Sequence, residues 1–137
     1  MLQVLIDADN VVPQRIRPVL AVLEELGTAV QVTVSGRPQV LDRTAWPDGS
    51  RLLPHAGWQQ ADLALAEAYS PSAGPLLLIT GDGDFGLLAS RHPGEVLVVS
   101  GAASGRLRDG TLVVDPAAEG TDRIRAWLAA YATESTS

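Results

Sequence analysis

Cysteine and lysine are both absent from this chain of 137 residues, and each absence excludes a class of chemistry. Without cysteine there is no disulfide framework and no thiolate metal site. Because all 10 basic residues are arginine, any mechanism that needs a lysine side chain is excluded. No apolar run approaches the roughly 18 residues of a membrane span, and the N-terminus lacks the basic region and the length of a secretory signal. We therefore expect a cytoplasmic protein with no membrane partner.

Positive charge is scarce but unevenly spread. The net charge is −6, which is unusual for a nucleic-acid binder. Residues 36–58 nevertheless carry three arginines against two aspartates, and residues 91–108 carry three arginines against one glutamate. These stretches are either solvated loops or a rim that tolerates a polyanion around an acidic centre.

The length and the 46% apolar content predict one compact domain over residues 1–132, followed by a polar tail at 133–137. The pattern predicts strands at 4–6, 29–34, 76–80, 96–99 and 111–114, and helices at 13–27, 61–69, 85–90 and 121–131. The strand runs are apolar throughout, which is typical of a parallel sheet buried on both faces. The expected fold class is α/β, a three-layer α/β/α sandwich with a central parallel sheet.

Four aspartates stand where such a sheet gathers function, beyond the carboxyl ends of its strands. Asp7 ends the first strand, Asp82 and Asp84 follow the strand at 76–80, and Asp62 opens a helix. If those two strands are neighbours, the four carboxylates converge and repel one another. A hard divalent cation, Mg²⁺ or Mn²⁺, relieves that repulsion. Such an ion can activate water and hold a phosphate, as phosphodiester hydrolysis requires.

Each aspartate also has a structural explanation. Asp7 suits a turn, Asp62 suits the first turn of a helix, and Asp82 and Asp84 suit a turn that caps a helix. Asp9 suits a cap of the helix that follows it. Four aspartates at the ends of two apolar strands together favour the metal site.

Trp46 and His92 can likewise be explained by structure alone. Trp46 either stacks on bases or covers the edge of the sheet, and His92 is expected at the surface or in a loop.

Three motifs occur in the order found in a known family. Residues 5–13, LIDADNVVP, resemble the opening motif of NYN domains, of the LabA-like kind, in the PIN-like nuclease superfamily. Residues 61–66, ADLALA, are similar to the family's middle helix, and residues 78–88, LITGDGDFGLL, to its strand-end motif. Residues 98–101, VVSG, resemble the next strand and its glycine.

The resemblance implies a PIN-like, Rossmann-like sheet with the first strand central, and a ribonuclease that depends on Mg²⁺ or Mn²⁺. By position it implies that the catalytic and metal-binding residues are Asp7, Asp62, Asp82 and Asp84. Asn10 and Thr80 would then order the site or the substrate. From the charge pattern we expect Arg37 and Arg106 to approach flanking phosphates of a single-stranded or structured RNA. A monomer or homodimer is expected, and an antitoxin or other regulatory protein is a possible partner.

Two departures from the family pattern keep other functions open. Residues 57–60 hold no basic residue where many relatives have lysine, and Glu67 and Ala68 stand where many have another aspartate. A catalytically weak RNA-binding or protein-interaction module is therefore one alternative. A haloacid-dehalogenase-like phosphatase is another, because Asp7 and Asp9 imitate its nucleophile and acid. That mechanism normally requires a lysine, which the chain lacks.

Overall fold

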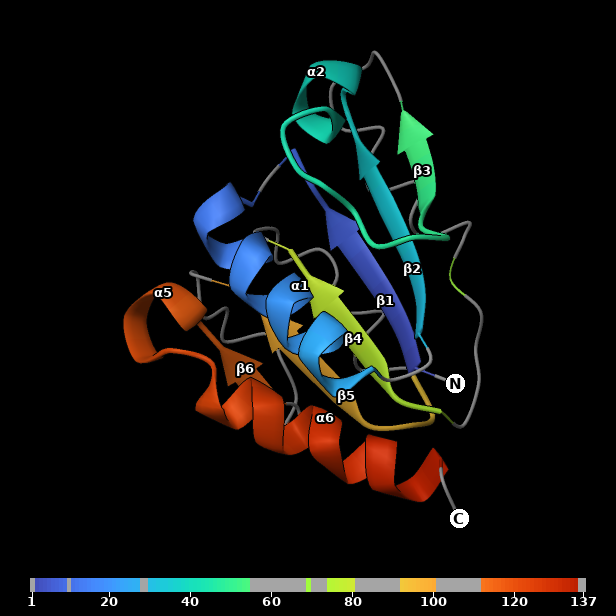
Figure 1. Ribbon diagram of the computed structural model, residues 1–137, viewed down its shortest axis with the longest axis vertical. Coiled ribbons are helices and arrows are strands. Elements are labelled where there is room, and N and C mark those ends of the chain that lie inside the picture. The colour runs from blue at the N-terminus through green and yellow to red at the C-terminus, as the bar shows by residue number, and fades with distance from the viewer. Residues whose placement is uncertain are drawn as a thin grey trace.

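The computed structural model describes residues 2–9, 11–27, 30–54, 69, 74–80, 92–100 and 112–135. Within them, six parallel strands form one sheet in the order β3-β2-β1-β4-β5-β6 (Figure 1). The strands are β1 (Leu2–Asp7), β2 (Val30–Gly36), β3 (Arg51–Pro54), β4 (Leu76–Ile79), β5 (Val96–Val99) and β6 (Leu112–Val114). The helices are α1 (Pro13–Leu26), α2 (Pro38–Leu41), α5 (Pro116–Glu119) and α6 (Asp122–Ser135). The prediction of a parallel sheet is confirmed.

Strand β1 lies at the centre, between β2 and β4. From β1 the chain extends the sheet first through β2 and β3, and later in the other direction through β4, β5 and β6. The order therefore reverses between β1 and β4, which makes their carboxyl ends the switch point where doubly wound sheets bind ligands. The first strand and the strand at 76–80 pair directly, which meets the condition on which the convergence of the aspartates depends.

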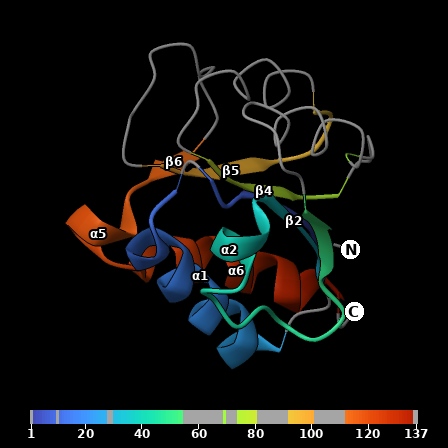
Figure 2. The same cartoon turned by 90° about the horizontal axis from the view of Figure 1, so that it is seen from above.

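Both faces of the central strands are buried, as expected from their unbroken apolar runs. Side chains alternate between two clusters: Val4 and Ile6 belong to the larger one, and Leu5 belongs to the smaller one. The larger cluster lies under α1 and α6, which cover the same face of the sheet (Figure 2). Asp7, by alternation, follows Leu5 onto the opposite face.

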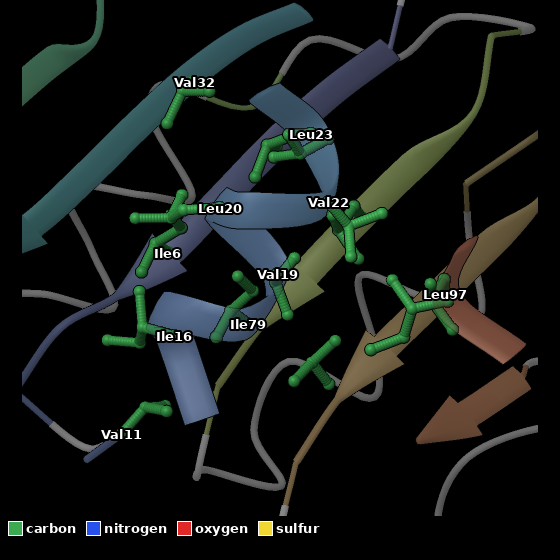
Figure 3. Close-up of a cluster of buried hydrophobic side chains, with 14 of the residues drawn as sticks. Ile6, Val11, Ile16, Val19, Leu20, Val22, Leu23, Val32, Ile79 and Leu97 are labelled. Carbon is green, nitrogen blue, oxygen red and sulfur yellow. The ribbon is translucent and has the colours of Figure 1, made fainter. Parts of the chain in front are cut away.

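Helix α1 matches the predicted bounds closely, because its ends have strong local signals. Pro13 occupies the first turn, and Gly27 ends the helix in the left-handed region at φ 61°. Between them Ile16, Val19 and Leu23 point into the larger cluster (Figure 3). Full burial of each such side chain stabilises the fold by about 1.5–3 kcal/mol.

Two ion pairs fasten the C-terminal region to α1. Arg15 of α1 meets Asp115 with Nε–Oδ1 at 3.0 Å, and Asp115 also caps α5 by accepting the backbone N–H of Ala117 at 3.0 Å. Arg125 of α6 donates to Glu25 of α1 at 2.8 Å. Beneath these contacts the buried side chains of α6 include Ile124 and Leu128.

Several predicted boundaries need correction or lie outside the described residues. Helix α6 continues to Ser135, so residues 133–135 are helical rather than part of a polar tail. The four-residue helices α2 and α5 were not predicted, because a single turn carries no helical period. The predicted helices at 61–69 and 85–90 fall outside the described residues, apart from Tyr69. Among the described helices, none combines the length and the apolar character that crossing a membrane requires.

Candidate functional site

Asp7 is a carboxylate buried at the carboxyl end of the central strand. Asp7 is 0% exposed, although charged residues such as aspartate are almost never fully buried unless they are paired. The Oδ1 oxygen accepts no hydrogen bond from the described residues, whereas Asp7 does interact elsewhere in the chain. Burying a charge costs free energy unless the site compensates it, so a position like this one marks a functional candidate.

A row of polar side chains crosses four neighbouring strands at this edge. Asp7 is in register with Ser35 of β2. Thr80 directly follows the last residue of β4, and the last β1–β4 pair immediately precedes Asp7 and Thr80. Ser100 follows β5 in the same way, beside Thr80. All four residues are buried, and alternation directs them to the face opposite α1 and α6.

The backbone ladder continues past the strand ends and holds this row in place. The N–H of Thr80 donates to the carbonyl of Val99 at 3.1 Å, and that of Ser100 donates to Val114 at 3.1 Å. The hydroxyl of Ser35 donates to the carbonyl of Leu53 on β3 at 3.4 Å. From the sequence we predict a role for Thr80 but none for Ser35 or Ser100. The signal that could have found them is a hydroxyl residue within or directly after an apolar strand run.

The described part of the row offers carboxylate and hydroxyl oxygens only. Hard cations such as Mg²⁺ and Mn²⁺ prefer oxygen ligands, so the donor set at Asp7 fits the expected metal. The other predicted site residues, Asp62, Asp82, Asp84, Asn10 and Arg106, lie outside the described residues. Within the described residues alone, no three acidic or histidine side chains are grouped closely enough to hold an ion.

Asp9 does not cap the next helix, contrary to the alternative considered for it. The N-cap of α1 is Val12, which makes no side-chain capping bond. Asp9 instead accepts the backbone N–H of Arg37 at 2.9 Å, and its Oδ1 lies 3.5 Å from the Nε of Arg37. This contact joins the chain after β1 to the chain after β2. Gly36 permits it, since a Cβ there would lie 3.3 Å from the Asp9 Oδ1.

Arg37 keeps access to solvent despite this contact. Its side chain is 50% exposed, against 15% for Asp9. Arg37 lines a cleft of about 430 Å³ that also receives Asp9, Arg43 and Trp46. A guanidinium that is half exposed at this edge can still reach an anionic ligand, and the role expected for Arg37 stays a prediction.

Trp46 is held by the protein itself. Its Nε1–H donates to the carbonyl of Leu41 at 2.9 Å, and the ring packs against the larger core cluster. Of the two alternatives considered for Trp46, packing is therefore observed. Trp46 also lines the cleft described above.

His92 lies outside helix and strand, as one of its two expected positions has it, but it is buried rather than at the surface. Its Nε2 lies 2.7 Å from the carbonyl oxygen of Gly74, which can only accept, so Nε2 carries the hydrogen. Its Nδ1 then accepts the hydroxyl of Tyr69 at 2.7 Å. Burial raises the pKa of the Tyr69 phenol above its usual 10.0. These contacts fasten the segment before β4 to the segment before β5.

Comparisons with protein-family models, with curated proteins and with solved structures gave no match. Function is therefore inferred from this chain's own residues. The strongest of these are buried Asp7, the hydroxyl residues beside it and the arginine-lined cleft at the same edge of the sheet.

Proposed function

We propose that this chain is a divalent-metal-dependent ribonuclease of the PIN-like type, close in kind to NYN domains. It would hydrolyse RNA phosphodiester bonds at an acidic site made of Asp7, Asp62, Asp82 and Asp84. The observation that carries the proposal is the fully buried carboxylate of Asp7 at the carboxyl end of the central strand. Burying a carboxylate costs free energy, and a cation held at this position would offset part of that cost.

The strand order supports this proposal. The sheet reverses between β1 and β4, and Asp7 and Thr80 stand at the ends of those two strands. In sequence, Asp82 and Asp84 come only two and four residues after Thr80. A ligand site at the switch point of a parallel sheet would therefore have access to carboxylates from both strands.

The cofactor we propose is Mg²⁺ or Mn²⁺, held chiefly by the carboxylates. When bound, the cation would supply an activated water and charge stabilisation for the phosphate. The chain's own contribution would be to fix the ligands. Burial of Asp7 within the sheet restricts its carboxylate to few rotamers, and the Thr80 hydroxyl provides a neutral donor beside it. Such preorganisation lowers the cost of assembling the reacting groups.

A phosphatase of the haloacid-dehalogenase type is less consistent with the geometry. That reaction would need Asp9 free to act as an acid beside Asp7. Asp9 is instead engaged with the backbone N–H and the guanidinium of Arg37. The absence of lysine points the same way.

A catalytically weak RNA-binding module of the same fold is the second candidate. The observation that favours it is the lack of a basic residue at 57–60, together with Glu67 and Ala68 in place of a further aspartate. Cleavage assays separate it from the nuclease.

The test is cleavage of a mixed-sequence single-stranded RNA in Mn²⁺, in Mg²⁺ and in EDTA. The wild type is compared with Asp82→Asn, and with Asp48→Asn as a control that makes the same change at an exposed carboxylate. We expect metal-dependent cleavage that is lost in Asp82→Asn, by at least about a hundredfold, and retained in Asp48→Asn. An active Asp82→Asn enzyme would refute the acidic site. Inactivity of the wild type, with RNA binding intact, would favour the binding module.

A further inference from the structure

The cleft that receives Arg37 adjoins the Asp7 site along the chain. Ala8 and Asp9, the two residues after Asp7, both line it. Arg37, which directly follows β2, lines it as well, so the cleft opens at the same edge of the sheet as Asp7. Pro13 and Ile16 of α1 also line it, so it lies on the α1 face of the sheet, across that edge from the Asp7 carboxylate. Its volume of about 430 Å³ falls within the roughly 300–1,000 Å³ of small-ligand pockets.

Three arginines gather at this cleft in a chain of net charge −6. Arg37 and Arg43 line it, and Arg17 lies against Arg43, donating to its backbone carbonyl at 3.4 Å. Neither Arg17 nor Arg43 forms an ion pair with a described residue. Asp9 is the acidic residue of the lining, and it is engaged with Arg37. Because exposed guanidinium groups repel one another, their clustering favours an anionic occupant.

Apart from Thr44, the remaining walls are apolar. Val12 is among the few large apolar side chains exposed to solvent, at 47%, and it lines the cleft together with Val40 and Trp46. An arginine fork matches the oxygen geometry of a phosphate, and an apolar wall suits the face of a base. A ligand that offers both is an unpaired nucleotide.

We propose that this cleft holds one nucleotide of a single-stranded RNA that crosses this edge of the sheet to reach the Asp7 site. Its phosphate would lie between the Arg37 and Arg43 guanidinium groups, with Arg17 adding charge, and its base would lie against Val12 and Val40. The inference rests on the proposed function for the identity of the strand. It adds the place where the substrate is held. It also assigns a role to Arg17, for which the sequence pattern predicts none, and a specific contact to Arg43, which the sequence places only in an arginine-bearing stretch.

The experiment measures RNA binding without cleavage. A fluorescein-labelled mixed-sequence single-stranded RNA is titrated with full-length protein in EDTA, by anisotropy, at several salt concentrations. The variants are Arg43→Gln and the double variant Arg17→Gln/Arg43→Gln. The control is Arg51→Gln, which removes the same charge at the amino end of the edge strand β3, where Arg51 is also exposed. Circular dichroism and thermal unfolding of each variant verify that it is folded.

We expect Arg43→Gln to weaken binding about fivefold and the double variant about twentyfold. The slope of log K against log salt should become shallower by about 0.7 for each phosphate that the variant no longer neutralises. Arg51→Gln should change binding less than twofold. Equal effects of Arg43→Gln and Arg51→Gln would overturn the proposal, and so would a wild type that does not bind RNA.

A competition arm separates a strand from a free anion. Inorganic phosphate, added at constant ionic strength, should not displace the RNA from the wild type. If it displaces RNA from the wild type but not from Arg43→Gln, the cleft is a site for phosphate itself and the strand assignment is wrong.

Failure of this inference and failure of the nuclease proposal give different results. If Arg43→Gln binds RNA as tightly as the wild type and still shows metal-dependent cleavage, the role of the cleft is refuted and the nuclease proposal is retained. If Arg43→Gln binds RNA more weakly than the wild type, and the wild type never cleaves RNA, the cleft is supported and the nuclease proposal is refuted.

Discussion

Replacing Asp7 by asparagine tests the proposed metal centre by a readout that needs no substrate. The change keeps the size of the side chain and removes its charge, so the packing at the end of β1 should be conserved. Because Asp7 is 0% exposed, nothing in solvent substitutes for the missing carboxylate. We therefore expect the metal-free variant to unfold within a few degrees of the wild type, while its metal-linked stabilisation disappears.

The size of that stabilisation follows from linkage. A cation present at 100 times its Kd stabilises the folded state by about 2.7 kcal/mol. In a domain of this length 1 kcal/mol shifts the Tm by about 3–4 °C, so saturating Mn²⁺ should raise the wild-type Tm by roughly 10 °C. Asp7→Asn should keep less than about a third of that shift, since one anionic ligand is gone.

The assay is thermal unfolding by circular dichroism, with Mn²⁺ and with EDTA, for the wild type, Asp7→Asn and Asp48→Asn. Asp48 is exposed, so its variant controls for nonspecific binding of the cation to surface carboxylates. A Mn²⁺ shift in Asp7→Asn as large as that of the wild type would show that Asp7 is not a ligand. Loss of the shift in Asp48→Asn would show that the stabilisation comes from the surface.

Three further predictions concern stability, each measured by urea unfolding. Asp115→Ala should cost about 1–2 kcal/mol, because it removes both a helix cap and the ion pair with Arg15, whereas Arg15→Ala should cost under about 1 kcal/mol. Equal losses of stability in Asp115→Ala and Arg15→Ala would show that the cap of α5 by Asp115 contributes nothing. Tyr69→Phe should cost about 1 kcal/mol at pH 8, because it removes the hydrogen bond to His92. The pKa of the Tyr69 phenol is raised in the folded state, so its stabilisation is complete below pH 10 and is lost as pH rises through the folded-state pKa. The difference in the free energy of unfolding between the wild type and Tyr69→Phe should thus narrow above pH 10. A constant difference would refute the raised pKa of the Tyr69 phenol. Gly36→Ala should destabilise by about 1–3 kcal/mol, because its Cβ would lie 3.2 Å from the Cβ of Ala8; a neutral variant would show that the neighbouring chain yields freely.

Local signals in the sequence were strong enough to define the central elements. Runs such as Leu76–Ile79 are apolar at every position, which is typical of a short strand buried on both faces. Helix α1 carries both its start, Pro13, and its end, Gly27, in residue types whose backbone preferences match those positions. The candidate role of Asp7 was visible for the same reason, because a carboxylate that interrupts an apolar run is conspicuous in sequence.

Other features depended on contacts between segments that are distant in the chain. Asp9 suits a capping role by its position in the sequence, and only its contact with Arg37, 28 residues away, shows otherwise. The burial of His92 depends on the carbonyl of Gly74 and the hydroxyl of Tyr69, and no local pattern announces either contact.

The sequence by itself determined that strands alternate with helices, that the sheet is parallel and that aspartates follow two of its strands. Only the tertiary structure decided that β1 and β4 are neighbours and that Ser35 and Ser100 complete a polar row with Asp7. It also decided that a cleft lined by two arginines, with Arg17 beside it, opens at the same edge. The physical reason is that periodicity reports which face of an element is buried. Which strands are neighbours, and in which register they pair, depends on contacts between segments that are distant in the sequence, and the local pattern of one strand does not identify its partner.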